Sequence, residues 1–183
     1  MRISAGRHGS RRLESLKGDV TRPTGDKVKE AIFSSIGPYF DGGIMLDLFG
    51  GSGGMGLEAI SRGMDFAFIC DKNKAAIQVI KKNVALLKEE SNTSVMQGDY
   101  HKILPCLQNE SFRLVYLDPP YALDVYEEIM MYLQEHQMLS QDAYVICESD
   151  AKLDLPEVVG HLHKQKEKVY GKSKIHMYRG EGE

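Results

Sequence analysis

The fold is decided by a glycine-rich segment that reads Asp47-Leu48-Phe49-Gly50-Gly51-Ser52-Gly53-Gly54-Met55-Gly56. An apolar run at 44–49 leads into it, and a helical pattern at 54–62 follows it. Gly51, Gly53 and Gly56 match the spacing G-x-G-x-x-G, which between a strand and a helix is typical of a loop that holds a nucleotide-like ligand. Glycines let the backbone turn sharply and approach such a ligand closely. The segment therefore predicts a strand, a binding loop and a helix in succession.

Strand-like and helical segments alternate over most of the chain. Apolar runs predict strands at 44–49, 66–70, 93–96, 112–117 and 143–147, and the stretches between them predict helices at 54–62, 74–89, 100–107 and 125–137. Within 74–89, apolar residues recur at three- and four-residue steps, which is the pattern of a helix with one buried face. Strands that alternate with helices predict a mostly parallel sheet covered on both faces.

The two ends of the chain depart from this alternation. Strand-like runs at 163–170 and 174–178 predict a C-terminal antiparallel hairpin. Near the N-terminus a helix is predicted at 26–36, with Thr24 or Asp26 as its cap. The pattern as a whole is that of the Rossmann-like class I S-adenosylmethionine-dependent methyltransferases, an α/β fold with a seven-stranded sheet. We expect one domain over 1–183, in which a basic extension at 1–36 packs on a core at 37–183.

Composition excludes several classes of protein. The chain has 183 residues, of which 42% are hydrophobic and 27% charged, as in ordinary globular domains. No stretch approaches the ~20 apolar residues of a membrane span, and the first residues do not resemble a secretory signal. Cys70, Cys106 and Cys147 are far apart in sequence and lie in or beside apolar runs, so we expect small buried residues and no metal site. These features predict a cytoplasmic protein that does not bind membranes.

The charge is unevenly distributed. The net charge is −3, but residues 1–31 carry +4, residues 161–179 carry +5 and the remainder carries −12. A basic patch matters more for phosphate binding than the total charge does. The alternative is that both basic runs are solvated faces without a partner.

Three acidic residues follow three successive predicted strands. Asp47 lies inside the end of the first strand, ahead of the glycines, Asp71 ends the second strand and Asp99 follows the third. A carboxylate at Asp47 would repel a pyrophosphate but attract an ammonium or sulfonium group. Asp71 stands where a carboxylate bonds ribose hydroxyls, and Asp99 stands where an acceptor can take an adenine amino group. Together they outline S-adenosylmethionine, and the residues assigned to this cofactor are Asp47, Phe49, Gly51, Ser52, Gly53, Asp71, Asp99 and Tyr100.

The fourth predicted strand ends at Asp118-Pro119-Pro120-Tyr121. Two prolines stiffen the loop and hold its carbonyl groups in place. An amine on a base is a poor nucleophile, because its lone pair is delocalised into the ring. Acceptors from Asp118 and Pro119 stabilise the charge that grows on this nitrogen, and Tyr121 can stack on a flipped-out base. We assign all four residues as catalytic; the simpler interpretation is a turn that only ends a strand.

At this point the sequence resembles the bacterial RsmD-type family of 16S rRNA guanine-N2 methyltransferases over nearly its whole length. The resemblance lies in Arg2-Ile3-x-x-Gly6, Arg11-Arg12-Leu13, Arg22-Pro23-Thr24-x-Asp26-x-Val28-x-Glu30 with Phe33, Asp47-x-Phe49-x-Gly51-Ser52-Gly53, Gly56-Leu57-Glu58-Ala59, Ser61-Arg62-Gly63, Asp118 to Tyr121 and Tyr170-Gly171. The Pro-Pro tetrapeptide is common to many amino-methylating enzymes, whereas the Arg-Pro-Thr helix is specific. The family often has Glu where this chain has Asp71.

The resemblance implies methylation of a guanine N2 amine in 16S rRNA, on the assembled small subunit, by a monomer that uses S-adenosylmethionine. It also implies that basic N-terminal residues contact the RNA. The residues assigned to RNA are Arg2, Arg7, Arg11, Arg12, Arg22 and Thr24. We expect the basic runs at 1–12 and 161–179 to bind rRNA phosphates.

Three other functions are compatible with parts of the sequence. An adenine-N6 or DNA methyltransferase would share the glycine loop and the tetrapeptide, but usually carries a target-recognition domain. A NAD-dependent oxidoreductase would explain G-x-G-x-x-G, but it gives Asp118–Tyr121 no role. A non-catalytic RNA-binding protein would use only the basic ends.

Overall fold

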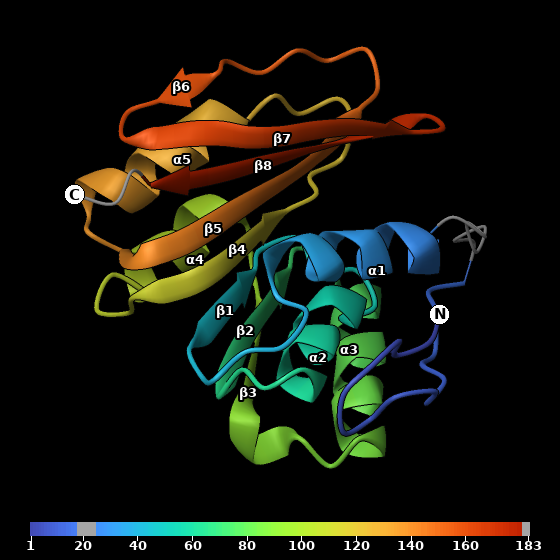
Figure 1. Ribbon diagram of the computed structural model, residues 1–183. Helices are drawn as coiled ribbons and strands as arrows, with labels where there is room; N and C mark the ends of the chain where they lie inside the picture. The colour runs from blue at the N-terminus through green and yellow to red at the C-terminus, as the bar shows by residue number, and fades with distance from the viewer. Residues whose placement is uncertain (18–24, 181–183) are drawn as a thin grey trace.

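The computed structural model describes residues 1–17 and 25–180 (Figure 1). Two residues predicted to contact RNA, Arg22 and Thr24, lie outside the described residues, and so does the predicted helix cap at Thr24. No helix in the described ranges is long and apolar enough to cross a membrane.

The centre of the molecule is one sheet, with the strand order β3-β2-β1-β4-β5-β8-β7-β6 (Figure 1). Its strands are β1 (Ile44–Asp47), β2 (Phe66–Asp71), β3 (Thr93–Gln97), β4 (Phe112–Leu117), β5 (Leu139–Asp150), β6 (Val158–Val159), β7 (Leu162–Tyr170) and β8 (Ser173–Gly180). The first five strands pair in parallel, and the last three pair antiparallel. The predicted mostly parallel sheet with a C-terminal hairpin is therefore confirmed.

The sheet has eight strands where seven were predicted. The additional strand, β6, pairs through only two residues, Val158 with His163 and Val159 with Leu162. Two residues are too few to produce an alternating apolar pattern, so the sequence carried no signal for this strand. The hairpin turn is also tighter than predicted, because Tyr170 pairs directly with Ser173. Gly171, with φ of +61°, occupies the first position of that turn, where glycine is favoured.

In the described part of the chain, five α-helices cover the two faces of the sheet. They are α1 (Gly25–Ile36), α2 (Gly54–Ser61), α3 (Lys74–Leu86), α4 (Tyr100–Cys106) and α5 (Tyr126–Glu135), with a 3-10 turn at Glu90–Asn92. Helices α1, α2 and α3 lie on one face, and α4 and α5 lie on the other (Figure 1). Asn73 caps α3, because its side chain accepts the N–H of Ala75 at 2.8 Å. Helix α3 ends earlier than predicted, before the left-handed residue Lys88.

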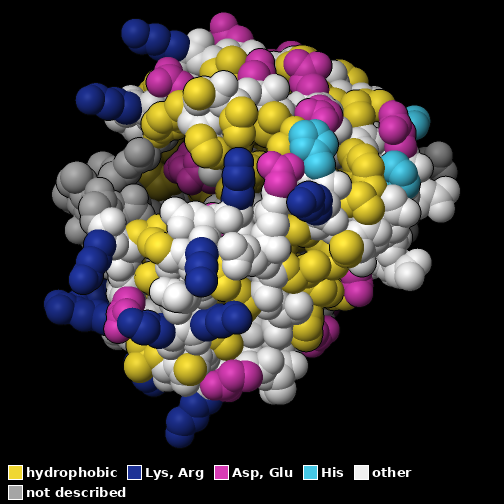
Figure 2. All heavy atoms as spheres, turned by 180° about the vertical axis from the view of Figure 1, so that it is seen from behind, with side chains coloured by type: hydrophobic (Ala, Val, Ile, Leu, Met, Phe, Trp, Pro, Cys, Tyr) yellow, Lys and Arg dark blue, Asp and Glu magenta, His cyan; other side chains and the backbone are white. Residues whose placement is uncertain are grey.

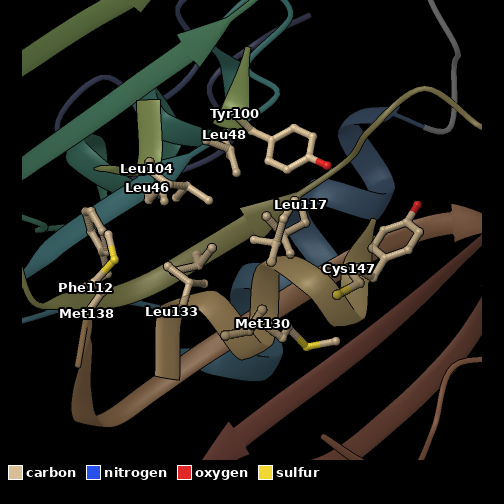
Figure 3. Close-up of a cluster of buried hydrophobic side chains, with 14 of the residues drawn as sticks. Leu46, Leu48, Tyr100, Leu104, Phe112, Leu117, Met130, Leu133, Met138 and Cys147 are labelled. Atoms are coloured by element: carbon tan, nitrogen blue, oxygen red, sulfur yellow. The ribbon is translucent and has the colours of Figure 1, made fainter. Parts of the chain in front are cut away.

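Each face of the sheet has its own hydrophobic core. Because side chains alternate along a strand, Met45 of β1 joins the core under α1–α3, and its neighbour Leu46 joins the core under α4 and α5. Figure 3 shows this second core, in which Leu46 and Leu117 of the sheet meet Leu133 of α5. Because both faces of the sheet are buried, the sequence of each of these strands is a continuous apolar run.

One cysteine differs from the expectation that all three are buried. Cys70 and Cys147 are buried in the sheet, but Cys106 is exposed at the end of α4. Its thiol points to the Lys102 carbonyl at 3.3 Å, on the solvent side of the helix. A position next to an apolar run does not fix the helical face, which the packing of α4 decides.

The N-terminal segment, residues 1–17, is held on the core by a buried carboxylate. Glu58 of α2 has no exposed surface, and its oxygens accept the backbone N–H groups of Ser4 (2.8 Å) and Ala5 (3.2 Å). Lys29 of α1 lies 3.2 Å from Glu58, and Arg62 donates to it at 2.8 Å. Hydrogen bonds and ion pairs of this kind offset the cost of burying a carboxylate. Glu58 therefore joins three segments that are far apart in sequence.

Candidate active site

A cavity of about 750 Å³ opens at the carboxyl ends of the parallel strands. The chain runs outward from β1 to β3 and then continues with β4 on the other side of β1, so the strand order reverses there. Open α/β sheets bind ligands at such a reversal. Figure 2 shows the hollow near the left edge of the molecule, with acidic and hydrophobic side chains inside it and Lys and Arg side chains on the surface above and below.

The glycine loop forms one wall of this cavity and is built as predicted. Gly51 and Gly53 have φ values of +61° and +85°, which favour glycine, and Gly53 is the N-cap residue that precedes α2. The N–H of Gly51 donates to the carboxylate of Asp71 at 2.9 Å, and the N–H of Gly50 donates to the Cys70 carbonyl at 2.6 Å. The end of β2 thus holds the loop in its turned conformation.

Asp47 is the most unusual acid of the site. It is 1% exposed, and one carboxylate oxygen accepts the N–H of Gly56 at 3.2 Å. The other oxygen has no hydrogen-bond partner among the described residues. Burial, with a smaller contribution from the charge of Asp71, raises the pKa of Asp47 to about 7. A buried, incompletely satisfied carboxylate that lines the cavity fits a ligand with a cationic group.

The wall next to Asp47 is aromatic. The ring of Phe49 packs against that of Tyr100 with centroids 6.1 Å apart, and the Tyr100 hydroxyl donates to Glu128 at 3.0 Å. Asp99 caps α4 by accepting the N–H of His101 at 3.0 Å, and the His101 ring approaches it to 2.9 Å. This backbone hydrogen bond, followed by the one from the ring, holds the pKa of Asp99 below its usual value. Asp99 therefore has two roles in the structure: it caps α4 through His101, and it lines the cavity.

Ser52 is the remaining residue predicted in this loop. Its carbonyl accepts the Asn83 side-chain N–H at 2.9 Å, and its hydroxyl lies 3.3 Å from the Met1 sulfur. Met1 lines the cavity, so the very start of the chain lies over the glycine loop. Nothing in the sequence pointed to Met1, because its position depends on how residues 1–17 fold back onto α2.

The Pro-Pro tetrapeptide lines the same cavity, at the end of β4, which pairs with β1. Asp118 is half-buried at the end of β4, Pro119 is buried, and Pro120 and Tyr121 are exposed. The Tyr121 hydroxyl lies 3.4 Å from that of Ser173, at the start of β8. The structure therefore brings together the two groups of residues that the sequence predicted separately, the cofactor loop and the catalytic tetrapeptide.

Two further residues of this cavity were missed by sequence reasoning. Glu148 of β5 lines the cavity, and so does Tyr116 of β4. Burial raises the pKa of Tyr116 well above its usual value, and the charges of Glu148 and Asp118 add to the increase. The only signal in the sequence was an acid one residue beyond the predicted strand 143–147.

The arginines assigned to RNA differ in their surroundings. Arg7 donates twice to Glu89, at 2.6 and 2.9 Å, and Arg11 donates to the Leu86 carbonyl at 3.2 Å. Both contacts attach residues 1–17 to the end of α3. Arg2 and Arg12 are exposed and pair with each other through their backbones in an isolated antiparallel bridge.

The basic C-terminal run is partly structural. Lys164 has a nearly buried side chain that donates to the Leu155 carbonyl at 2.8 Å, and Lys174 donates to Asp154 at 3.0 Å. Lys166, Lys168 and Lys172 are exposed on the hairpin. Within residues 1–17 and 25–180, no three His, Cys, Asp or Glu side chains are arranged to hold a metal ion.

Comparisons with known proteins give the family of the chain and agree with its fold. The model of the family described as conserved hypothetical protein 95 matches residues 1–179. YlbH of Bacillus subtilis is 40% identical over 100% of both chains. Ribosomal RNA small subunit methyltransferase D of Escherichia coli K12 is 31% identical, over 100% of this chain and 91% of that protein.

Solved structures show the same architecture. That of Escherichia coli yhhF is 30% identical, with a TM-score of 0.85 over 100% of this chain and 99% of that one. The structure of SMU.776 complexed with SAH has a TM-score of 0.67 over 84% of this chain and 48% of that one. At 13% identity, SMU.776 shows likeness of fold only.

Proposed function

The chain belongs to the family described as conserved hypothetical protein 95, and on that premise we propose that it transfers a methyl group from S-adenosylmethionine to the N2 amine of a guanine in 16S rRNA. The choice of small subunit rRNA as the substrate is supported by ribosomal RNA small subunit methyltransferase D of Escherichia coli, which matches the full length of this chain. The cofactor is supported by the shared fold of SMU.776, whose structure holds SAH.

The observation that carries the proposal is one cavity lined by two different groups of residues. The first group, Asp47 and the glycine loop, suits a cationic ligand, because a buried carboxylate oxygen there has no partner among the described residues. The second group is Asp118 with the rigid Pro119-Pro120 turn. A methyl donor bound by the first group and an amine bound by the second would meet in this cavity, and such positioning supplies much of the rate of a group transfer.

On the cofactor side, Asp47 would pair with the ammonium of S-adenosylmethionine, and Asp71 would hold the ribose while it supports the loop through Gly51. Phe49 and Tyr100 would cover the adenine. The cofactor supplies an electrophilic methyl group on sulfur, and the residues of this chain bind and orient it.

On the substrate side, the Asp118 carboxylate and the Pro119 carbonyl would accept hydrogen bonds from the two N–H groups of the target amine. The nitrogen then forms its bond to the methyl carbon as the carbon–sulfur bond breaks, and the proton that the nitrogen loses passes through Asp118 to water. Acceptors fixed in advance stabilise the developing charge without having to reorganise. Tyr121 is half-exposed at the mouth and would stack on the flipped-out guanine.

The substrate we propose is the assembled small subunit, bound by a cytoplasmic monomer. The cavity is lined by several acids, which would repel phosphates, so the RNA backbone must be bound outside it. Exposed basic residues on the N-terminal segment and on the hairpin, such as Arg2, Arg12 and Lys168, are suited to that role.

The test is methyl transfer to small subunits purified from cells that lack this protein, with the product nucleoside identified by mass. The purified protein should produce N2-methylguanosine, and Asp118→Ala should produce none while its melting temperature still rises with S-adenosylhomocysteine. NAD should not raise the melting temperature. N6-methyladenosine as the product, or full activity in Asp118→Ala, would contradict the proposal.

A further inference from the structure

Two carboxylates come at the ends of adjacent strands beside the cavity. In the parallel pairing of β4 and β5, Leu117 is opposite Cys147, and Asp118 and Glu148 are the next residues after this pair. Both line the cavity. Asp118 is explained by the transfer reaction, but that reaction requires no second carboxylate beside it.

Glu148 is held in place through its backbone and faces the same cavity as a tyrosine. Tyr116, on β4 two residues before Asp118, lines the cavity with Glu148, and the charge of Glu148 helps to raise the pKa of the Tyr116 hydroxyl. The Tyr126 hydroxyl of α5 donates to the Glu148 backbone carbonyl at 2.6 Å. That bond fixes the backbone of Glu148, and the carboxylate itself has about four acceptor positions with which it can bind a ligand.

A carboxylate can only accept hydrogen bonds, and this property selects among purine bases. Guanine presents two adjacent donors on its Watson–Crick edge, the N1–H and the N2 amine. Adenine presents its amine next to an N1 lone pair, and 2-aminopurine keeps the N2 amine of guanine but also has a lone pair at N1. Two neighbouring carboxylates therefore match the two donors of guanine and repel the N1 lone pair of the other two bases.

We infer that Glu148 determines the specificity for guanine by accepting the N1–H of the flipped-out base, while Asp118 accepts its N2 amine. This inference rests on the proposed function and extends it from the reaction to the selection of the base. Sites that hydrogen-bond a donor of the correct substrate discriminate strongly against analogues that lack it, because the polar group of the site is then left unpaired.

The experiment compares guanine with 2-aminopurine at the target position. Small subunits are reconstituted with a synthetic rRNA segment that carries one base or the other at the nucleotide identified by mass, and methyl transfer is measured as kcat/KM. The wild-type protein should prefer guanine by about 100-fold or more. The variant Glu148→Gln, whose amide can donate as well as accept, should lower that preference by at least about tenfold. Glu135→Gln, an exposed acid on α5, is the matched control and should keep the wild-type preference.

The ratio of the two rates is informative because general damage to the site lowers both rates together. An unchanged ratio in a Glu148→Gln variant that still binds S-adenosylhomocysteine would overturn the inference. Equal rates of the wild-type protein on the two bases would overturn it without any variant. Failure of the proposed function would look different, since the wild-type protein would then form no N2-methylguanosine on the guanine-containing subunits.

Discussion

The carboxylate of Asp47 accepts the backbone N–H of Gly56 at 3.2 Å, across the whole length of the glycine loop. This single bond leaves the second carboxylate oxygen buried and without a partner among the described residues. Because burial outweighs this hydrogen bond, the pKa of Asp47 rises to about 7. The loop that we assign to the cofactor is thus closed over an acid that changes its charge near neutral pH.

The raised pKa predicts how stability depends on pH. Between pH 4 and 7 the unfolded chain loses the Asp47 proton while the folded chain keeps it, so this residue makes folding less favourable as the pH rises. Asp47→Asn cannot ionise. Its free energy of unfolding, relative to that of the wild type, should therefore increase by on the order of 2 kcal/mol from pH 5 to pH 7.5. Urea unfolding at both pH values measures this difference, and a constant difference would contradict the prediction.

The same residue predicts how cofactor binding depends on pH. If the ionised form of Asp47 pairs with the ammonium of the ligand, binding must first remove the proton. The Kd of S-adenosylhomocysteine should then fall about tenfold between pH 6 and pH 8. Isothermal titration calorimetry should show this decrease for the wild type and for Glu135→Gln. Asp47→Asn should bind more weakly and without this pH dependence; the same pH dependence in that variant would rule Asp47 out as its source.

Glu58 should be a major contributor to stability. It is completely buried between Lys29 and Arg62, and removing one partner of such a cluster leaves the other charges buried without compensation. We expect Glu58→Ala to lower the free energy of unfolding by about 3 to 5 kcal/mol. Glu30→Ala, at an exposed position of α1, should change it by no more than about 0.5 kcal/mol. Similar values for the two variants in urea unfolding would show that Glu58 is not an anchor.

Gly6 should be required for the docking of the N-terminal segment. Its φ is +84°, and a Cβ atom there would lie 1.8 Å from the carbonyl oxygen of Ser61. Gly6→Ala should therefore displace residues 1–17 from α2, and trypsin should then cleave the loosened backbone after Arg11 and Arg12 faster than in the wild type. Limited proteolysis followed by mass spectrometry measures the rate of cleavage at these sites. Gly25→Ala, where a Cβ would contact nothing within 4 Å, should be cleaved there at the wild-type rate.

The basic N-terminal segment should contribute to RNA affinity through charge alone. Arg11 and Arg12 are both exposed. Replacing both with Gln should weaken binding to small subunits and reduce the slope of log Kd against log salt by up to about 2, because fewer counterions are released. Filter binding at several salt concentrations provides the slope. Identical slopes for the variant and the wild type would show that Arg11 and Arg12 do not contact RNA phosphates.

The order and type of the elements could be predicted from the sequence because their signals are local. Apolar runs and helical periodicity marked β1 to β5 and the helices, and Gly51 and Gly53 marked the loop by their conformational freedom. The placement of Asp47 and Asp118 at one edge followed from parallel pairing, which brings the carboxyl ends of all strands to the same side. The predicted ends of helices and strands were less accurate, because caps and side-chain packing decide where each element stops.

The sequence by itself thus determined the sheet of mostly parallel strands, the glycine loop and the two groups of residues around the cavity. Only the tertiary structure decided which other side chains join them. Glu148 reaches Asp118 through the register of two strands that lie about thirty residues apart in the chain, and Glu58 becomes an anchor because α1, α2 and residues 1–17 meet around it. Arg7 pairs with Glu89 because residues 1–17 fold back onto the end of α3. Pairing and burial of this kind depend on long-range packing, which leaves no pattern in neighbouring residues.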